Sequence, residues 1–190
     1  MIRLATPEDI PIVVDIHSQS LSEDYLPRLG KKAVHGYYNT LMRKNPIILV
    51  EEENRIIGFV ALSIYQISLR NVFIKYYKTI IIKLLLQPDL WCQTLWLALY
   101  SKRHKYGYPE ISFVAVKKEY RGVGIGSQLI TWVCNFISKK GVEYLRVKTE
   151  AANINTDRFY KKNMFRFVST EKRFNRNFNV YLREVKVGNS

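Results

Sequence analysis

The sequence predicts a mixed α/β fold, and three observations support this prediction. Short apolar runs typical of strands alternate along the chain with segments whose apolar residues recur at helical spacing. The composition of 47% apolar and 24% charged residues lies near the average of globular proteins. The length of 190 residues is about that of one domain, and neither an internal repeat nor an interdomain linker is visible. We therefore expect a single domain over residues 1–190.

The first third of the chain is expected to form two helices and then a strand hairpin. Thr6-Pro7-Glu8-Asp9 has the residues of a helix start, because threonine caps, proline suits the first helical position and aspartate completes a near capping box. The apolar residues that follow at helical spacing are Ile10, Val13, Val14 and Ile16. A second helix follows Gly30, and the strands are Ile47–Val50 and Arg55–Ile67, joined by a polar turn. The second strand is apolar almost throughout, which indicates that both of its faces are covered.

Residues 68–108 are too many for a plain loop inside a compact domain. Apolar residues at helical spacing predict one helix from Phe73 to Leu85 and another from Leu90 to Tyr100. The first of these helices is basic, with Arg70, Lys75, Lys78 and Lys83. We therefore expect a helical insertion here.

The C-terminal half has clearer elements and closes with an antiparallel pair of strands. A Gly-rich turn joins the first strand to an amphipathic helix, which Gly141 ends. In order, the expected elements are a strand at Ile111–Val116, the turn at Arg121–Gly126, a helix at Ser127–Lys139, a strand at Tyr144–Thr149, a short helix at Asp157–Lys162, and strands at Phe165–Ser169 and Val180–Lys186.

The charge and the cysteine content limit the classes of partner and site. Thirty Lys and Arg against 16 Asp and Glu give a formal net charge of +14, which favours anionic partners such as nucleic acid, acidic lipid or a phosphorylated ligand. With only Cys92 and Cys134, a disulfide framework and a four-cysteine zinc site are excluded, and both cysteines are expected to be reduced and buried. No carboxylate–histidine cluster has the spacing of metal ligands, so no metal is expected.

The N-terminus and the apolar runs give no sign of a signal peptide or of a membrane-spanning segment. The residues after Met1 become polar and acidic at once, so we expect a cytoplasmic protein. The richest apolar stretch, Ile80–Leu86, is far shorter than the about 20 residues that a spanning helix needs.

The segment Arg121-Gly122-Val123-Gly124-Ile125-Gly126-Ser127 is the most informative about chemistry. Its three alternating glycines lie between a strand and the start of a helix, where free backbone N–H groups form a cradle for an anion. A Walker loop would end in Gly-Lys-Ser/Thr, and the dinucleotide fingerprint would read G-x-G-x-x-G with an acidic residue about twenty residues later. Neither pattern fits. The glycines predict a phosphate site of another kind, or else they only shape a tight turn.

Arg121–Gly126 matches the pattern Arg/Gln-x-x-Gly-x-Gly/Ala, and here the chain resembles the GNAT superfamily of acyl-CoA-dependent N-acyltransferases. The preceding segment Phe113–Val116 is similar to the central strand of that family, which splays from its neighbour and admits the pantetheine arm. The start of the chain, Ile2–Asp9, is similar to the Arg-x-Ala-x-x-x-Asp opening that is common in the family.

A second motif strengthens the resemblance. Asn153–Phe165 resembles the family signature Asn-x-x-Ala-x-x-x-Tyr-x-x-x-Gly-Phe, in which Asn153 and Tyr160 match the Asn and the Tyr. Thr156 replaces the usual Ala, and Asn163-Met164 replaces the usual step to Gly, both mild departures. The resemblance therefore covers nearly the whole chain except the insertion.

The resemblance implies a fold and an activity. The fold is α/β (α+β), with a mixed, mostly antiparallel central sheet flanked by helices and a helical insertion, residues 68–108, between the third and fourth strands. The activity is transfer of an acetyl group from acetyl-CoA to a primary amine of a small molecule, an amino sugar or a peptide, by direct attack in a ternary complex. The residues expected to bind the cofactor are Val114, Ala115, Val116, Arg121, Gly122, Val123, Gly124, Ile125, Gly126, Ser127, Asn153 and Tyr160.

Within this set the resemblance implies separate tasks. Amides from Gly122 to Ser127 would hold the pyrophosphate, and N–H groups near Val114 and Val116 would polarise the acetyl carbonyl.

Two residues are expected to transfer protons. Tyr160 matches the tyrosine of the family and would protonate the leaving thiolate; the alternative is a packed aromatic residue. Glu110 lies where the histone-modifying branch of the family keeps its glutamate base; the alternative is a solvated surface charge. His104 and His35 are further candidates for the base.

Other functions and several roles for the insertion stay open. A basic nucleic-acid-binding module, and a GNAT-like protein that binds acetyl-CoA without catalysis, are the alternative functions, although the ordered motifs weigh against nucleic acid. The apolar face of the insertion must cover the acceptor side of the active site, a second subunit of a homodimer, or a membrane surface. We favour a lid that sets acceptor choice, because both ends of the insertion open onto the strand that carries Glu110 and Val114.

Overall fold

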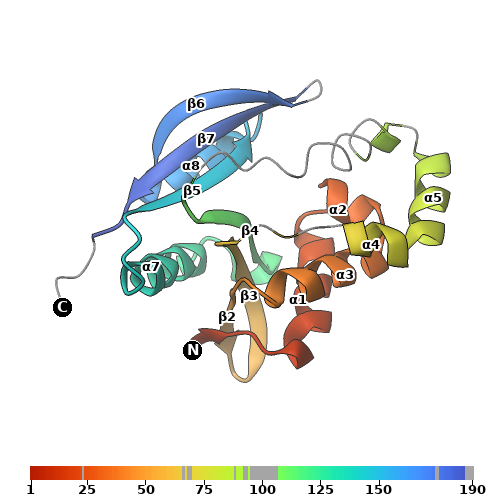
Figure 1. The fold of residues 1–190 in the computed structure, drawn as a ribbon. Coiled ribbons are helices and arrows are strands. Elements are labelled where there is room, and N and C mark those ends of the chain that lie inside the picture. Colours follow the sequence, from red (N-terminus) through yellow and green to blue (C-terminus); the bar gives the residue numbers. More distant parts are fainter. Residues whose placement is uncertain are drawn as a thin grey trace.

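The centre of the structure is a seven-stranded sheet with the strand order β1-β2-β3-β4-β5-β7-β6 (Figure 1). The structure is a computed structural model that describes residues 1–22, 24–65, 67, 70–87, 89–91, 94, 107–173 and 176–186. The strands are β1 (Ile2–Leu4), β2 (Ile47–Glu52), β3 (Arg55–Ser63), β4 (Glu110–Val116), β5 (Tyr144–Glu150), β6 (Arg166–Arg173) and β7 (Arg176–Glu184). Of the neighbouring strands in this sheet, β4 and β5 pair in parallel and the others antiparallel. The predicted mixed, mostly antiparallel sheet is confirmed.

Helices cover both faces of this sheet (Figure 1). The helices are α1 (Ile10–Ser20), α2 (Tyr25–Arg28), α3 (Lys31–Met42), α4 (Arg70–Lys75), α5 (Tyr77–Leu86), α7 (Ile125–Ser138) and α8 (Ile154–Lys162), with short 3-10 turns at Pro7–Asp9 and Lys118–Tyr120. Helix α7 packs on one face through residues such as Leu129 and Val133, and α1 and α3 pack on the other through Val13 and Tyr38.

Strand β3 contributes to both cores, because successive side chains of a strand point to opposite faces. Val60 belongs to the core beneath α7, and its neighbour Phe59 belongs to the core beneath α1 and α3. Every residue from Ile56 to Leu62 is buried. The prediction that this strand is covered on both faces is confirmed.

The predicted helix start at Thr6 forms a capping box. The Thr6 N–H donates to the Asp9 carboxylate at 2.7 Å, and one 3-10 turn precedes α1. Asp9 also accepts hydrogen bonds from the Arg3 guanidinium at 2.6 and 2.9 Å, which lowers the pKa of Asp9 to about 2. Arg3 pairs in addition with Glu51 of β2 at 2.6 Å. These contacts hold the edge strand β1 against β2 and the start of α1. The sequence pattern does not indicate this strand.

The strand predicted to run to Ile67 ends at Ser63. The reason lies in the side chain of Asn45, whose oxygen accepts hydrogen bonds from the N–H groups of Ile64 and Tyr65, both at 2.7 Å. The Asn45 amide also donates to the Tyr65 carbonyl at 3.0 Å. One side chain thus takes the backbone groups that a longer strand would offer to its neighbours, and the prediction was too long for that reason.

The described part of the insertion between β3 and β4 is mainly helical, as predicted, but the prediction of its first helix is wrong in one respect. The segment from Phe73 to Leu85 forms two helices, α4 and α5, which separate at Tyr76. The Tyr76 ring packs over Gly36 of α3, where an added Cβ would lie 2.5 Å from a ring atom. This contact with another helix lies at the break between α4 and α5, and local spacing does not reveal it.

Other predictions for this region fall partly outside the described residues. Of the predicted helix Leu90–Tyr100, residues Leu90, Trp91 and Thr94 are described and are helical. Cys92 lies outside the described residues, and Cys134 is buried as predicted. None of the helices in the described part of the chain is long and apolar enough to cross a membrane.

Candidate active site

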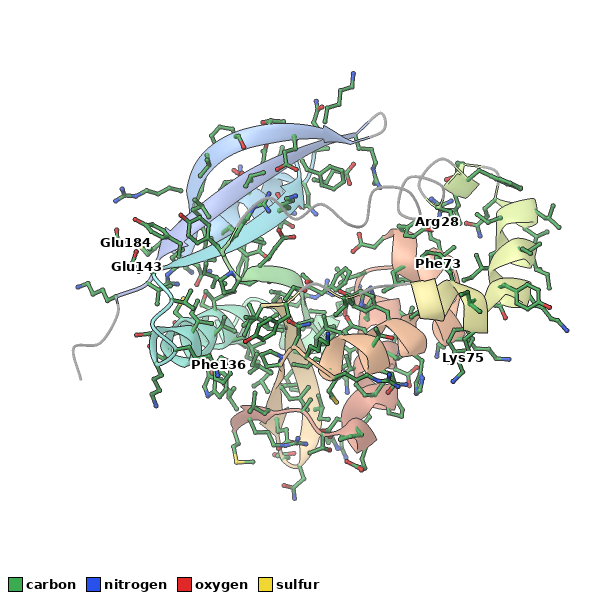
Figure 2. The ribbon with its side chains drawn as sticks, in the orientation of Figure 1. Arg28, Phe73, Lys75, Phe136, Glu143 and Glu184 are labelled. Carbon is green, nitrogen blue, oxygen red and sulfur yellow. The ribbon has the colours of Figure 1, made fainter. Side chains whose placement is uncertain are left out.

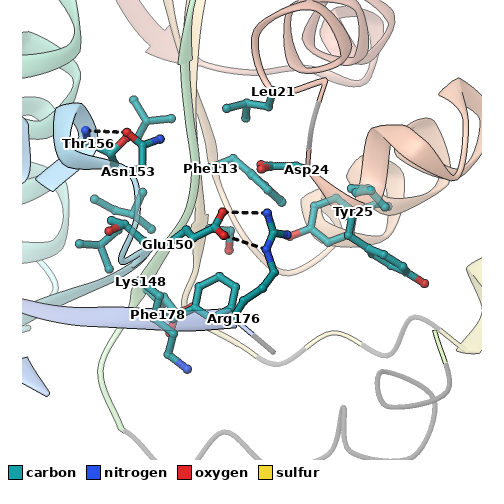
Figure 3. Close-up of a pocket in the computed structure, with 18 of the residues that line it drawn as sticks. Leu21, Asp24, Tyr25, Phe113, Lys148, Glu150, Asn153, Thr156, Arg176 and Phe178 are labelled. Carbon is teal, nitrogen blue, oxygen red and sulfur yellow. Dashed lines mark hydrogen bonds and ion pairs between the residues drawn. The ribbon is translucent and has the colours of Figure 1, made fainter. Parts of the chain in front are cut away.

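The sheet opens where β4 and β5 separate. These strands pair only at Glu110↔Arg146 and Ile111↔Val147 and then diverge. A cavity of about 470 Å³ lies at this split (Figure 3). Strands β4, β5 and β7 and helix α8 line one side of it, and the end of α1 together with α2, α3, α4 and α5 lines the other. The split therefore gives the sheet an opening at its centre.

Strand β4 turns backbone N–H groups toward this opening. The Lys117 N–H donates to the Ile57 carbonyl of β3 at 2.8 Å. Because hydrogen-bonded pairs alternate along antiparallel strands, Ala115, two residues earlier, also directs both its N–H and its carbonyl toward β3. The backbone groups of Val114 and Val116 alternate with these and face β5. Val114 lines the cavity, whereas Ala115 has its polar groups engaged and its side chain in the core beneath α1.

The glycine turn, Arg121–Ser127, lies at the start of α7. Gly122 and Gly124 have φ angles of 84° and 90°, in the left-handed region that favours glycine. No side chain caps the helix, and its first backbone hydrogen bond runs from Gln128 N–H to the Gly124 carbonyl. The N–H groups before Gln128 therefore have no acceptor within the helix, which is the condition for anion binding at a helix start. A Cβ on either glycine would meet no atom within 4 Å, so the space beside the turn is open.

Two contacts hold this turn between β4 and α8. The Arg121 guanidinium folds back, and its Nε donates to the Val116 carbonyl at 2.8 Å. Gly126 lies against Phe159 of α8, where an added Cβ would lie 3.0 Å from a ring atom. An added side chain would press against the Phe159 ring, so a glycine favours the close approach of α7 and α8. The turn is thus fixed beside the two elements that carry Val114 and Tyr160 into the cavity.

Tyr160 lines the cavity from α8, and its side chain is 5% exposed. Its ring packs edge-on against Phe159 and Phe165 and stacks with Tyr181. Burial raises the pKa of Tyr160 well above its ordinary value, so the phenol keeps its proton at neutral pH. None of the hydrogen bonds within the described part of the chain involves its hydroxyl.

Asn153, the other residue of the predicted signature, caps α8. Its side-chain oxygen accepts a hydrogen bond from the Thr156 N–H at 3.1 Å, and both residues line the cavity. The asparagine therefore fixes the start of the helix that presents Tyr160.

Glu110 begins β4, lines the cavity and belongs to a buried ion network. Its Oε2 accepts a hydrogen bond at 2.9 Å from the guanidinium of Arg146, a residue that is only 1% exposed. Arg146 also pairs with Glu171 of β6 at 2.9 Å, and Glu171 pairs with Lys148 at 2.9 Å. The alternative of a solvated surface charge is therefore wrong. A buried guanidinium that loses a partner is costly, so Glu110 supports the fold whether or not it takes part in chemistry.

The opposite wall of the cavity is mainly apolar. It comes from α1, α2, α3 and the insertion helices α4 and α5, through Leu21, Tyr25, Leu26, Leu29, Ala33, Tyr37, Val72, Phe73 and Ile80. The inner face of the insertion therefore lines the cavity, which is the position that the lid hypothesis requires.

Charged and polar side chains that the sequence analysis does not single out face this cavity (Figure 3). Glu150, at the end of β5, accepts two hydrogen bonds from Arg176 of β7, both at 2.8 Å. Asp24 faces this pair from the segment before α2, and desolvation raises the pKa of Asp24 although its carboxylate opens onto the cavity. Thr149 is buried, and its hydroxyl has no hydrogen-bond partner in the described structure. No local pattern marks these residues, which only the topology brings together.

The described histidines lie outside the cavity. His35 on α3 pairs with Asn39 at the surface at 2.9 Å, and His104 lies outside the described residues. His17 is buried in the core beside Phe113, its Nδ1 lies 2.5 Å from the Tyr38 hydroxyl, and burial lowers the pKa of His17 to about 4. Within the described ranges, no group of three or more His, Cys, Asp or Glu side chains could hold a metal ion.

A comparison of the sequence with models of protein families identifies the family. The model described as the Acetyltransferase (GNAT) family matches residues 12–165, from α1 to the residue before β6. The chain belongs to the GNAT family of acetyltransferases. The resemblance drawn from the glycine turn and from Asn153–Phe165 is therefore confirmed. A search of curated protein sequences finds no match.

Solved acetyltransferase structures share the fold of this GNAT protein. A ribosomal-protein-alanine N-acetyltransferase from Brucella melitensis is 17% identical with a TM-score of 0.64, and the match covers 97% of this chain and 99% of that one. The ribosomal-protein-S18-alanine N-acetyltransferase from Escherichia coli is 10% identical with a TM-score of 0.66, covering 99% and 95%. An acetyltransferase from Bacillus anthracis in complex with acetyl coenzyme A is 17% identical with a TM-score of 0.53, covering 78% and 68%. At these identities the likeness shows the fold alone.

Proposed function

We propose that this GNAT protein transfers an acetyl group from acetyl-CoA to a primary amine by direct attack in a ternary complex. The observation that carries the proposal is the split between β4 and β5, which turns the Val114 N–H toward the cavity that Tyr160 also lines. A fixed N–H donor stabilises the negative charge that develops on a thioester oxygen under attack. A protonated phenol in the same cavity supplies the proton that a leaving thiolate needs.

The residues around the split fit coenzyme A. Its pyrophosphate needs N–H donors with no side chains in the way, and the turn from Gly122 to Ser127 provides them at the start of α7. The positive net charge of +14 favours the same phosphates. The acyl end would lie along Val114–Val116, next to the part of the cavity that Asn153 lines. When bound, acetyl-CoA supplies the activated acetyl group.

Tyr160 and Glu110 are proposed to move the two protons of the reaction. The phenol of Tyr160 is protonated at neutral pH, as its raised pKa ensures, and it is the proposed acid. The attacking amine must lose a proton, and Glu110 is the proposed acceptor, directly or through water. Since Glu110 also neutralises the buried Arg146, its catalytic and structural roles have to be measured separately.

The cavity favours an acceptor amine with an apolar body over an amino sugar. The wall formed by α1 to α5 is mainly apolar, so the hydroxyl groups of a sugar would lose hydrogen bonds to water there without replacement. Glu110 and Glu150 are paired with arginines, whereas Asp24 has no ion pair in the described part of the chain. Asp24 is therefore the carboxylate proposed to attract the cationic amine, and the insertion helices α4 and α5 are proposed to set the size of its apolar body.

The test combines a calorimetric titration of acetyl-CoA with thiol release in the presence of 2-phenylethylamine or glucosamine. We expect acetyl-CoA to bind and 2-phenylethylamine to be the better acceptor. Asp24→Asn should raise the KM for that amine about tenfold, the value of one charge-assisted hydrogen bond, and leave acetyl-CoA binding unchanged. The matched control is Asp15→Asn, because Asp15 is an exposed carboxylate on α1 that pairs with Lys31 at the surface.

Each alternative function has its own outcome in this experiment. Acetyl-CoA binding without transfer to any amine would favour a catalytically silent GNAT protein. Salt-sensitive binding of an oligonucleotide, with no binding of acetyl-CoA, would favour a nucleic-acid-binding module.

A further inference from the structure

The outer surface of the insertion exposes a cluster of large apolar side chains. Seven of the 17 exposed large hydrophobic residues of the described structure lie here, each 49–70% exposed: Ile74, Tyr77, Ile81, Ile82, Leu85, Leu86 and Trp91. We call this cluster the insertion surface. Figure 2 shows α5 at the edge of the molecule with side chains that project outward. Large apolar patches on the surface of a globular protein mark sites where it meets another protein or a membrane.

Helix α5 buries one stripe and leaves the other uncovered. Ile80 and Leu84, one turn apart, are 4% and 8% exposed and pack with Leu29 and Ala33 against the body of the protein. Ile82, midway between them in sequence, points the other way, because each residue turns the helix by about 100°. Ile81, Leu85 and Leu86 are exposed as well. The fold therefore uses only the inner stripe of α5, and the packing within the described structure does not explain the outer one.

The insertion surface is also basic. The sequence has no Asp or Glu between Glu53 and Asp89, so α4 and α5 carry no acidic side chain. Lys75 and Lys78 are exposed within the cluster. Asp89, the nearest acid that follows, is paired with Arg28 at 2.7 Å. Apolar groups and lysines, with no acidic residue on the same helices, therefore occur together on one surface.

We propose that the insertion surface docks onto a membrane that contains anionic lipid. A helix at a membrane interface places its apolar side chains among the headgroups and acyl chains, while its lysines pair with anionic headgroups. With ten residues, α5 is too short to cross a bilayer and would lie in the plane of the interface. The proposal rests on this surface alone and not on the proposed acetyl transfer.

Trp91 suits such an interface. Its indole N–H donates to the Leu84 carbonyl at 3.0 Å, so its polar atom is satisfied within the protein, while the side chain is 53% exposed. Tryptophan is enriched at the boundary between membrane and water.

A second copy of the chain fits this surface less well than anionic lipid does. In a symmetric dimer the same patch would meet itself, so Lys75 and Lys78 of the two copies would be close together. Two molecules of net charge +14 would also repel each other as they approached. Anionic lipid neutralises the same lysines.

The experiment measures partitioning of the full chain onto vesicles of phosphatidylcholine, with and without phosphatidylglycerol. The double variant Ile82→Glu/Leu86→Glu adds two charges to the insertion surface at residues that are 56% and 70% exposed, so the fold should tolerate it. The matched control Ile12→Glu/Val168→Glu changes the net charge equally at two residues, 43% and 53% exposed, on α1 and β6.

We expect the wild-type protein to bind vesicles that contain phosphatidylglycerol. Ile82→Glu/Leu86→Glu should weaken this binding at least about tenfold, since it removes two aliphatic side chains from the interface, and the control should change it little. Lys75→Ala/Lys78→Ala should weaken it about 25-fold, about fivefold for each lysine, with no effect on neutral vesicles. Acetyl-CoA binding should be the same in all variants, which keeps this test separate from that of the proposed function.

Three results would overturn the proposal. The first is that vesicles containing phosphatidylglycerol do not retain the wild-type protein. Both double glutamate variants could lose binding equally, in which case overall charge alone is responsible. Light scattering could show a wild-type dimer that Ile82→Glu/Leu86→Glu dissociates without any vesicle binding, and the surface would then be an interface between copies.

Discussion

Replacing Tyr160 with Phe removes one oxygen from the cavity and leaves the ring contacts in place. The side chain is 5% exposed, and its contacts with Phe159, Phe165 and Tyr181 involve only the ring. If the phenol protonates the leaving thiolate, the turnover number should fall about 10²- to 10⁴-fold, which raises the barrier by about 3–5 kcal/mol. The hydroxyl makes no hydrogen bond within the described structure, so the free energy of unfolding and the Kd for acetyl-CoA should stay unchanged.

Tyr38→Phe is the matched control, because it removes a buried hydroxyl that supports the core and does not line the cavity. The Tyr38 hydroxyl pairs with His17 Nδ1 at 2.5 Å. Its loss leaves a buried nitrogen without a partner and should lower the free energy of unfolding by about 1–3 kcal/mol. Turnover, measured well below the unfolding temperature, should be nearly that of the wild type.

Thiol release and urea denaturation on the same preparations therefore separate two roles of a buried tyrosine. A Tyr160→Phe variant with wild-type turnover would refute the assignment of the acid and leave Tyr160 as a packing residue. A variant that loses stability along with activity would show that the hydroxyl is structural.

Three further predictions test the glycine turn, the base and the core. Gly124→Asp places a carboxylate at the anion site and should abolish most acetyl-CoA binding in calorimetry. The control Gly141→Asp changes a glycine with a similar left-handed φ of 70° at the far end of α7 and should leave the binding unchanged. An equal loss of binding in both variants would point to backbone strain as the cause. Glu110→Gln should flatten or move the acid limb of the pH–rate profile and, through Arg146, lower the thermal stability measured in parallel; an unmoved limb places the base elsewhere. Burial lowers the pKa of His17 from 6.5 to about 4, so the unfolded chain binds this proton first as the pH falls. The free energy of unfolding should therefore be unaffected by this histidine above pH 6.5 and fall by up to about 3 kcal/mol as the pH decreases toward 4 and below. Urea denaturation would refute this if a His17→Leu variant lost stability with falling pH as steeply as the wild type.

The structural features that could be predicted from the sequence alone depend on residues close together in the chain or on the regular spacing of apolar residues. Gly122 and Gly124 are recognisable because a left-handed backbone at a strand-to-helix junction favours glycine. The capping box at Thr6 needs only residues three positions apart, and the covered strand β3 follows from an unbroken apolar run. The order of such local patterns was enough to indicate the fold and the GNAT family.

The tertiary structure alone decided which distant groups meet. Asp24 faces Glu150 and Arg176 across the cavity, although more than a hundred residues of chain separate them, and no local spacing encodes that meeting. The same holds for Arg146, which turns Glu110 from an apparent surface charge into one end of a buried network. These pairings depend on strand order and on the divergence of β4 from β5, which follow from the packing of the whole sheet. The residues that we propose to distinguish acceptors therefore became visible only in the folded chain.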